Sequence, residues 1–297
     1  MVLPELDVAQ LLAEHRQLID SELDRAVQLA APEQLFRSMR YSLLAGGKRL
    51  RPTLCLAVCT AGGGTVASAL PTAIALEMLH TATLIHDDLP VMDDDDFRRG
   101  RPTNHKVFGE QLALLTGDAL LSYSLEWVLT QTQAPADRVL RVMHVLLRAI
   151  GVEGAIGGQV VDTSISIDDT VELATLEWMY TRKTGALLVA AVTSGAILAG
   201  LDEDAVGRLQ RYGEHVGLAF QIIDDVLDLT STLEHLGKRP GQDARGRKVT
   251  IPALIGLEAA REQACRLIEA AKDELETLGP VASPLRTIAD FVYARSA

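Results

Sequence analysis

The chain has 297 residues and is acidic, with 40 Asp and Glu against 28 Lys and Arg and a net charge of −12. This balance argues against a nucleic-acid partner, because binding to a phosphate backbone requires a concentrated positive surface. Hydrophobic residues make up 48% of the chain, which excludes general disorder and predicts a large buried core. No Pro- or Ser-rich linker divides the sequence, so residues 1–297 are interpreted as one domain.

The cysteines and the N-terminal segment bear on the cellular compartment. Cys55, Cys59 and Cys265 lack partners at metal-ligand spacing, and an odd number fits a reducing compartment better than a disulfide framework. Acidic residues begin at Glu5, and no basic start followed by an apolar run is visible, so no signal or transit peptide is expected. We therefore expect a cytoplasmic protein.

Nearly every segment has the apolar spacing of an α-helix, and no Asn-Gly turn between β-branched runs indicates a hairpin. We expect an all-α bundle of about ten to twelve helices. Helices should begin after Pro32, after Asp202, and at Ser283-Pro284, where a capping residue precedes proline. The expected breaks between helices fall at residues 46–47, 62–64, 89–102, 151–158 and 236–246.

Two uncharged stretches, residues 52–76 and 184–201, invite comparison with membrane spans. The first contains three consecutive glycines from Gly62 and then Pro71, which together predict two short helices. The second is rich in Ala and Gly, whereas a spanning helix requires about 20 strongly apolar residues. Both stretches are interpreted as buried core helices, and no membrane span is expected.

The first basic segment is Gly46-Gly47-Lys48-Arg49-Leu50-Arg51, which directly precedes Pro52. Its glycines allow the backbone to approach an anion, and Lys48 and Arg51 supply positive charge. The alternative is that these side chains only complement the dipole of a neighbouring helix end.

An acidic run follows, and it contains Asp87, Asp88 and Asp93. These three residues would not share one face of a continuous helix. Pro90 disfavours helical geometry at the residue before it, so the helix should end there. The chain can then fold back and bring Asp93 beside Asp87.

The acidic run continues to Asp96, and the charge then reverses at Arg98-Arg99. Carboxylates next to paired arginines favour a metal-bridged phosphate site, because the guanidinium group binds phosphate oxygens directly. A calcium-binding loop is the alternative. It is disfavoured because the Asp/Asn alternation and the terminal Glu of an EF-hand loop are absent from the sequence.

A second acidic cluster consists of Asp224, Asp225 and Asp228 on a segment with helical spacing. Residues four apart on a helix lie about 40° apart around the axis and about 6 Å apart along it, so the three carboxylates share a face. They repel one another unless a cation lies between them, and oxygen ligands favour Mg²⁺ or Ca²⁺ over zinc. A merely solvated acidic face is disfavoured, because Ile222-Ile223 and Val226-Leu227 predict a mostly buried helix.

Further basic residues lie at breaks between apolar segments. Lys183-Thr184-Gly185 opens the second uncharged stretch, Lys238 follows the second acidic cluster, and Lys248 lies at the far end of that Gly-rich segment. Each alone is compatible with simple exposure to solvent. Together with two metal-type clusters, they indicate a site for diphosphates.

The two aspartate motifs, together with Gly47-Lys48-Arg49-Leu50-Arg51-Pro52, resemble those of the trans-isoprenyl diphosphate synthases, in order and spacing from about residue 30 onward. The segment 77–110 is most similar to geranylgeranyl diphosphate synthases of bacteria and plastids, with farnesyl diphosphate synthases next. The resemblance implies the isoprenoid synthase fold, a single-domain bundle around a central active-site cavity. It also implies a homodimer and head-to-tail (1'-4) condensation of isopentenyl diphosphate with dimethylallyl, geranyl or farnesyl diphosphate.

The resemblance also implies roles for individual residues. Three Mg²⁺ ions would be held by Asp87, Asp93, Asp224 and Asp228, aided by Asp88 and Asp225. The allylic diphosphate would be bound by Arg98, Lys183, Gln221, Lys238 and Lys248, with the Thr184 hydroxyl and the Lys183 carbonyl facing the developing cation. Isopentenyl diphosphate would be bound by Gly47, Lys48, Arg51, His80 and Arg99. Two departures from the family pattern are Gln242, where a second lysine is usual, and Ile251, where a tyrosine is usual.

Product length is expected to depend on Ala82 and Thr83, which lie about 6 to 7.5 Å before Asp87 along the helix. Their small side chains leave room at the level where the resemblance implies an aromatic floor in farnesyl diphosphate synthases, so geranylgeranyl diphosphate is the expected product. The alternative is a floor on a neighbouring helix, with farnesyl diphosphate as the end product.

Three further alternatives belong to other classes of protein. A non-catalytic subunit of a heteromeric synthase should have lost an acidic cluster, and this chain keeps both. A terpene cyclase should carry an Asn/Ser/Glu metal motif in place of the second cluster. A calcium-responsive or structural helical protein would show no Mg²⁺-dependent turnover.

Overall fold

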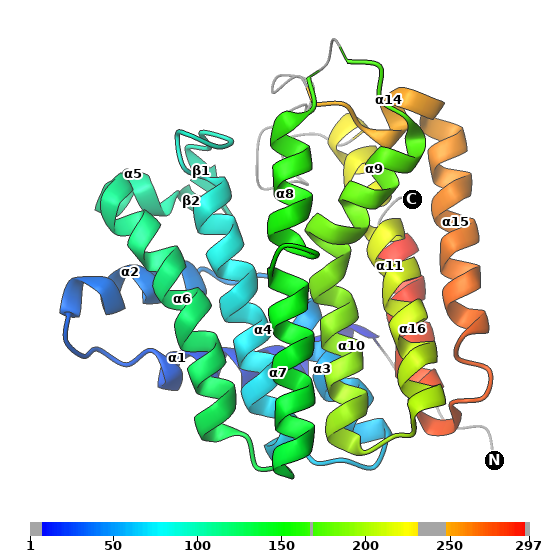
Figure 1. Cartoon of the computed structure of the whole chain (residues 1–297), viewed down its shortest axis with the longest axis horizontal. Helices are drawn as coiled ribbons and strands as arrows, with labels where there is room; N and C mark the ends of the chain where they lie inside the picture. The colour runs from blue at the N-terminus through cyan, green and yellow to red at the C-terminus, as the bar shows by residue number, and fades with distance from the viewer. Residues whose placement is uncertain (1–7, 167–168, 231–247, 295–297) are drawn as a thin grey trace.

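The computed structural model describes residues 8–166, 169–230 and 248–294 (Figure 1). Lys238 and Gln242 lie outside these residues. The N-terminal half of the described chain forms α1 (Val8–Ala26), α2 (Glu33–Leu43), α3 (Leu50–Ala61), α4 (Val66–Asp87), β1 (Phe97–Arg98), β2 (Arg101–Pro102), α5 (Asn104–Phe108), α6 (Glu110–Gln131) and α7 (Ala136–Ile150). The remainder forms α8 (Ala155–Ser164), α9 (Leu173–Tyr180), η1 (Thr181–Gly185), α10 (Ala186–Ala199), α11 (Glu203–Thr230), α14 (Ile251–Ile255), α15 (Leu257–Asp273), η2 (Gly279–Val281) and α16 (Ala282–Ala294).

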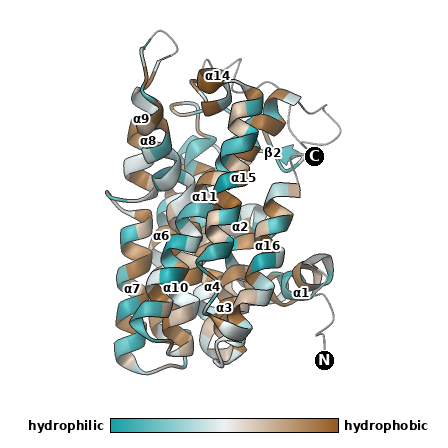
Figure 2. Cartoon of the chain, turned by 90° about the vertical axis from the view of Figure 1, so that its right-hand side faces the viewer, coloured by the Kyte–Doolittle hydropathy of each residue, from teal (hydrophilic) through white to brown (hydrophobic). Residues whose placement is uncertain are grey.

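The chain is all-α, as its apolar spacing predicts, and its helices pack around a shared apolar core. Helix α4 packs against α3 and α6, while α10 packs against α3, α7 and α11, and α15 covers α11. Figure 2 shows hydrophilic and hydrophobic residues alternating along the helices, as expected where one face is buried and the other meets water. Long helices with amphipathic faces thus build the scaffold on which the polar residues are placed.

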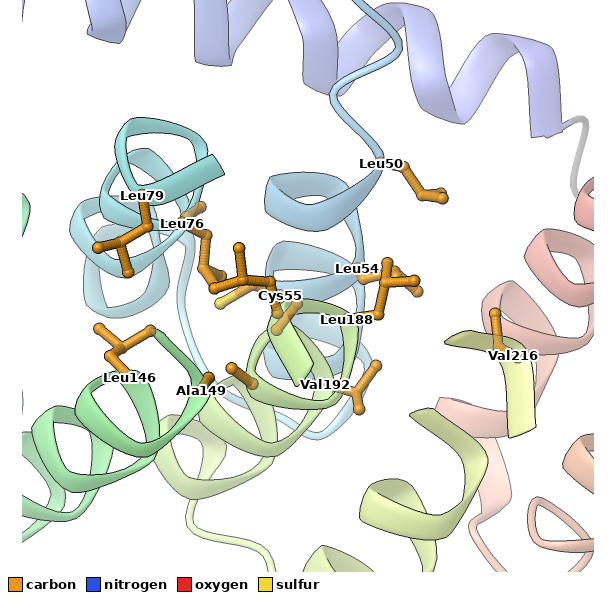
Figure 3. Close-up of a cluster of buried hydrophobic side chains, with 14 of the residues drawn as sticks. Leu50, Leu54, Cys55, Leu76, Leu79, Leu146, Ala149, Leu188, Val192 and Val216 are labelled. Atoms are coloured by element: carbon orange, nitrogen blue, oxygen red, sulfur yellow. The ribbon is translucent and has the colours of Figure 1, made fainter. Parts of the chain in front are cut away.

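The core is formed where α3, α4, α7 and α10 meet (Figure 3). Leu76 and Leu79 of α4 face Leu146 of α7, and Cys55 of α3 lies between α4 and α10. Helix α10 approaches α3 closely at Gly195, where an added Cβ would lie 2.6 Å from the Cys55 carbonyl oxygen. Close packing of this kind fixes the relative positions of the helices, because interiors have little empty space.

Several predicted helix starts are confirmed. Helix α2 begins directly after Pro32, and α11 begins after Asp202, whose carboxylate accepts a hydrogen bond from Ala205 N at 2.9 Å. Helix α16 begins at Ala282 rather than at Ser283-Pro284, because the 3₁₀ turn η2 leads directly into it.

The structure also corrects the expected breaks. Pro71 lies inside α4 and does not end it. The helix begins at Val66, where Thr65 caps it by accepting a hydrogen bond from Ser68 N at 3.1 Å, and continues past the proline to Asp87. Helix α8 begins at Ala155, so Gly157 and Gly158 lie within it rather than in a break. The absence of hairpin signals did not exclude the short antiparallel pair β1–β2, in which Phe97 is opposite Pro102.

Three helical segments are long and apolar enough to cross a membrane by length and composition alone. In the described structure, 78% of the apolar window in Val66–Asp87 and 67% of that in Leu173–Ala199 is buried, whereas in Glu110–Gln131 the buried share is 39%. Val66–Asp87 and Leu173–Ala199 therefore lie largely inside the bundle, as core helices do. Glu110–Gln131 carries an exposed apolar face.

Candidate active site

A cavity of about 1370 Å³ is formed between α4, α6, α8, η1 and α11 and is completed by the segment that leads into α14. Figure 1 shows the end of α4, the β1–β2 pair and the segment before α14 at the same end of the bundle. The predicted site residues that line this cavity are Arg51, His80, Asp87, Asp93, Arg98, Arg99, Lys183, Thr184, Gln221, Asp224, Asp225, Asp228 and Lys248. Gly47, Lys48 and Asp88 are not among the described residues that line it.

The first acidic cluster is folded as the position of Pro90 predicts. Helix α4 ends at Asp87, and the chain folds back so that Asp93 N donates a hydrogen bond to the Asp87 carbonyl oxygen at 2.9 Å. Burial raises the pKa of the Asp87 carboxyl above its ordinary value, although Lys183 opposes this shift. The two carboxylates therefore face one cavity from a turn that the backbone itself stabilises.

Asp88 is placed differently from its neighbour. Its side chain is buried, and Arg98 Nε donates to its Oδ1 at 2.8 Å while Arg98 Nη2 also bonds to Asp95 at 2.9 Å. Burial raises the pKa of Asp88 to about 6, with Arg98 acting in the opposite direction. Asp88 thus orients Arg98, which itself lines the cavity.

Gly47 contributes by leaving space for Arg99. Its φ of +133° and its packing both require glycine, because an added Cβ would lie 2.8 Å from Arg99 Cζ. Arg99 also donates a hydrogen bond to the Gly46 carbonyl oxygen. Lys48 is an exposed residue of this loop. The loop therefore positions Arg99 at the cavity wall.

His80 and Arg51 also line the cavity. Burial lowers the pKa of His80 well below its ordinary value, and the nearby guanidinium groups of Arg51 and Arg99 lower it further. His80 is consequently neutral at physiological pH. Among the described residues, none provides a hydrogen-bond partner for the buried Arg51 Nε. This arrangement has the donors and the positive charge that an anionic ligand requires.

Arg49, in contrast, belongs to the protein interior. Its guanidinium group is fully buried and donates to Asp20 at 2.8 Å, to the Leu43 carbonyl oxygen at 2.6 Å and to Glu77. Glu77 was missed by the sequence reasoning, although an acidic residue within an apolar helix is itself a signal for a buried ion pair. This pair connects the start of α3 to α4.

A π-helical turn interrupts the helix between α9 and α10. The turn, η1, comprises Thr181–Gly185 and places Lys183 and Thr184 on the cavity wall. Helix α8 approaches it closely at Gly158, where an added Cβ would collide with the Lys183 backbone nitrogen. Single π-turns of this kind occur frequently at functional sites.

Asp162 of α8 was not predicted as a site residue, yet its carboxylate contacts two cationic side chains of the cavity. Lys183 Nζ lies 2.5 Å from Asp162 Oδ2, and Lys248 Nζ lies 3.5 Å from the same oxygen. Lys248 Nζ also lies 2.9 Å from Asp93 Oδ1. Burial opposes ionisation, but the two lysines together lower the pKa of Asp162 below its ordinary value. The sequence signalled it only as the one charged residue of an otherwise uncharged short helix.

The second acidic cluster lines the cavity as its spacing predicts, but its members differ in their partners. Asp225 is buried, accepts a hydrogen bond from Gln221 Nε2 at 2.9 Å and accepts another from the Tyr180 hydroxyl. Gln221 Oε1 in turn accepts from the Thr184 hydroxyl at 2.6 Å. The sequence reasoning did not identify Tyr180, which carries no charge and ends an apolar helix.

Ala82 does not lie where the sequence reasoning expected. Its side chain is fully buried, whereas Thr83 lines the cavity. The physical reason is the helical period, which places His80, Thr83 and Asp87 on one face of α4 and Ala82 away from it. The expected role of Ala82 as a cavity wall is therefore wrong.

Within the described ranges, no three Asp, Glu, His or Cys side chains converge closely enough to form a complete metal cage. The carboxylates instead line the two sides of the cavity and face cationic side chains. Magnesium is commonly bound in this way, through one or two carboxylates together with substrate phosphates and water. The donor set therefore fits Mg²⁺ held jointly by the protein and a diphosphate.

The fold and the site define an all-α enzyme with acidic clusters and cationic side chains arranged around one cavity of about 1370 Å³. The sequence matches the polyprenyl synthetase family over residues 32–286. The chain belongs to this family, whose members are prenyltransferases.

Similar proteins include two relatives and one solved structure. The chain is 52% identical to a dimethylallyltranstransferase of Fischerella ambigua, over 96% of this chain and 83% of that protein. It is 49% identical to a geranylgeranyl diphosphate synthase of Cyanophora paradoxa, over 96% of this chain and 95% of that protein. Among solved structures, an FPP/GFPP synthase of Zymomonas mobilis has a TM-score of 0.86 at 35% identity, covering 96% of this chain and 98% of that one.

Proposed function

We propose that this chain is a Mg²⁺-dependent geranylgeranyl diphosphate synthase. It would condense isopentenyl diphosphate head to tail (1'-4) with dimethylallyl, geranyl and farnesyl diphosphates. The observation that carries the proposal is the convergence of both acidic clusters and the cationic side chains on one cavity of about 1370 Å³. The name of the Cyanophora paradoxa relative supports geranylgeranyl diphosphate as the product.

We assign the metal ligands to the acidic residues on the two sides of the cavity. Asp87 and Asp93 would hold two Mg²⁺ ions, and Asp224 with Asp228 would hold a third. When bound, Mg²⁺ supplies positive charge that stabilises the departing diphosphate. Asp88 would orient Arg98 by accepting its hydrogen bond, and Asp225 would orient Gln221 in the same way.

Cationic side chains would bind the diphosphate of the allylic substrate. Arg98, Lys183 and Lys248 line the cavity close to the first acidic cluster, and Lys238 is assigned to the same group. Breaking the allylic C–O bond separates charge, so positive groups that are already in place lower the barrier. Lys183 and Lys248 would exchange their contacts with Asp162 for contacts with the substrate.

Isopentenyl diphosphate would bind to a separate group of hydrogen-bond donors. Arg51, His80 and Arg99 line the cavity, while Gly47 and Lys48 belong to the loop that positions Arg99. Neutral His80 can donate a hydrogen bond to a phosphate oxygen without adding charge. After the C4–C1 bond forms, a proton would leave C2 of the isopentenyl unit, and the released diphosphate would accept it.

Thr184 and Gln221 would face the developing allylic cation. The Thr184 hydroxyl donates to Gln221 at 2.6 Å, so the hydroxyl oxygen retains lone pairs that can be directed into the cavity. Leu187 and Phe220 also line the cavity and provide an apolar wall for the prenyl chain beside these two polar groups.

The product length is attributed to the wall of α4 beyond the metal-binding end. Thr83 is small and lines the cavity, and the next turn on the same face is formed by Leu76 and Leu79, which are fully buried. The prenyl chain would pass Thr83 and stop against this packed layer (Figure 3). Farnesyl diphosphate as the end product is the competing outcome, and product analysis distinguishes the two.

A homodimer is proposed from the exposed apolar face of α6 and α7. Leu114, Leu115 and Leu129 of α6 and Leu140 and Leu147 of α7 are all about half exposed or more. Apolar residues grouped on neighbouring helices favour association with a partner of similar character. We also propose that residues 1–297 form one domain and act in the cytoplasm.

Turnover with and without Mg²⁺ tests the proposed function. The full chain should convert isopentenyl and farnesyl diphosphates to a longer prenyl diphosphate with Mg²⁺, and should lose this activity when EDTA is added. Asp87→Asn and Asp224→Asn should each lower kcat by at least about a hundredfold. Activity that is insensitive to EDTA would contradict the proposal.

A further inference from the structure

Tyr180 occupies a junction between three elements of the site. It is the last residue of α9, directly before the π-turn, and its side chain is buried. Its hydroxyl donates a hydrogen bond to Asp225 Oδ2 of α11 and accepts one from the backbone N–H of Ile251, the first residue of α14, at 3.3 Å. One phenol oxygen thus connects α9, α11 and α14.

The hydrogen bond from Tyr180 determines the orientation of the Asp225 carboxylate. Asp225 is buried, and its two carboxylate oxygens accept from different donors, Tyr180 at Oδ2 and Gln221 Nε2 at Oδ1. A buried carboxylate is costly unless donors of this kind stabilise it. The hydroxyl of Tyr180 therefore fixes the carboxylate in the orientation that receives Gln221.

The orientation of Gln221 follows from that of Asp225. A carboxylate only accepts hydrogen bonds, so the side of the Gln221 amide that faces it must be the NH₂ group. The Gln221 carbonyl oxygen consequently points toward Thr184, whose hydroxyl donates to it at 2.6 Å. The hydroxyl proton of Thr184 is then engaged by Gln221, and the lone pairs of its oxygen are left to face the substrate.

We propose that Tyr180 is a positioning residue for the condensation reaction, acting through Asp225 to set the Gln221 amide and the Thr184 hydroxyl. The inference rests on the proposed function, because it assigns Gln221 and Thr184 to the wall that faces the allylic cation. Tyr180 itself needs no contact with the substrate. Its effect should therefore appear in kcat rather than in the KM for isopentenyl diphosphate.

The matched variants are Tyr180→Phe and Tyr212→Phe. Tyr212 is fully buried in α11 and donates to the Leu285 carbonyl oxygen at 2.8 Å, away from the cavity. Both substitutions remove one hydroxyl from a buried ring. Tyr180→Phe should lower kcat by about tenfold to a hundredfold, as expected for a lost hydrogen bond to a charged group, with KM for isopentenyl diphosphate within about twofold. Tyr212→Phe should leave kcat within about twofold of wild type.

A double-mutant cycle tests whether Tyr180 acts through Gln221. In a Gln221→Leu background, Tyr180→Phe should change kcat by less than about twofold, because the amide that it orients is already absent. A full effect in that background would overturn the inference, and so would a Tyr180→Phe enzyme with the kcat of wild type. Thermal unfolding of each variant separates these outcomes from loss of the fold.

An activity-independent measurement distinguishes failure of this inference from failure of the proposed function. The side-chain NH₂ resonances of Gln221 should shift in the NMR spectrum of Tyr180→Phe and remain at their wild-type positions in Tyr212→Phe. Unchanged Gln221 resonances in Tyr180→Phe would overturn the positioning role. A wild-type chain that forms no prenyl product would contradict the proposed function, and the NMR comparison would still test the hydrogen-bonded connection.

Discussion

The Lys183 ammonium group lies 2.5 Å from the Asp162 carboxylate on the wall of the cavity. The same carboxylate oxygen lies 3.5 Å from Lys248 Nζ. One anion thus anchors two cations that come from distant parts of the sequence. This relationship indicates that the two lysines proposed to bind the diphosphate are oriented before the substrate arrives.

Replacing this anchor should slow the reaction. Asp162→Asn should lower kcat with farnesyl diphosphate by about tenfold, because Lys183 and Lys248 lose their common partner and a small misplacement of charged groups is costly. Asp137→Asn, on the exposed first turn of α7, is the control and should behave as wild type. Steady-state kinetics with equal rates for Asp162→Asn and wild type would refute the anchoring role.

A methyl group at Gly47 should affect one substrate more than the other. Gly47→Ala should raise the KM for isopentenyl diphosphate by about tenfold, because the added Cβ would lie 2.8 Å from Arg99 Cζ and displace that side chain. The control is Gly63→Ala, which also has positive φ but has no atom within 4 Å of the added Cβ. Equal KM increases in both variants would mean that backbone strain, and not Arg99, causes the effect.

The ion pair between Glu77 and Arg49 should stabilise the fold. Glu77→Gln should lower the free energy of unfolding by about 3–5 kcal/mol, because it leaves the fully buried Arg49 charge without its closest carboxylate. Glu33→Gln removes an exposed partner of Arg37 and should cost at most about 1 kcal/mol. Urea unfolding measures both values. A small loss for Glu77→Gln would show that Asp20 alone compensates the arginine.

His80 should make stability depend on pH. Burial lowers the pKa of His80 in the folded protein, so below the ordinary value near 6.5 the unfolded chain binds a proton that the folded chain does not. Stability should therefore fall as the pH decreases from 6.5 toward the lowered pKa, by at most about 1.4 kcal/mol per pH unit. His80→Asn should reduce this slope, while His144→Asn on the exposed face of α7 should keep it. An identical slope in His80→Asn would contradict this origin.

An aromatic residue at Thr83 should shorten the product. Thr83→Tyr places a ring on the cavity face of α4, one turn before Asp87, where it would block the prenyl chain. The expected products end at farnesyl length. Thr60→Tyr, at the exposed end of α3, is the control and should leave the product distribution unchanged. Geranylgeranyl diphosphate from Thr83→Tyr would place the floor on another helix.

Local rules predicted much of this site. The rotation of a helix per residue placed Asp224 and Asp228 on one face, and the effect of Pro90 on its neighbour predicted the turn that returns Asp93 to Asp87. Both depend only on residues that are close in the sequence. The overall all-α class followed for the same reason, since apolar spacing reports on the buried face of each helix.

The remaining features depend on contacts between distant segments. Asp162 meets Lys183 and Lys248 only after α8, the π-turn and the segment before α14 have packed together. The role of the Tyr180 hydroxyl becomes apparent only when the structure shows that it donates a hydrogen bond to Asp225. Ala82 was misplaced because its distance along the helix was considered without its direction around the axis.

Mass analysis of the prenyl products tests directly whether this chain makes geranylgeranyl diphosphate. The full chain would be incubated with Mg²⁺, isopentenyl diphosphate and, in separate reactions, dimethylallyl, geranyl and farnesyl diphosphate. We expect geranylgeranyl diphosphate as the dominant product from each starter. A farnesyl end point would contradict the assigned product length, and no condensation with any starter would contradict the proposed activity itself.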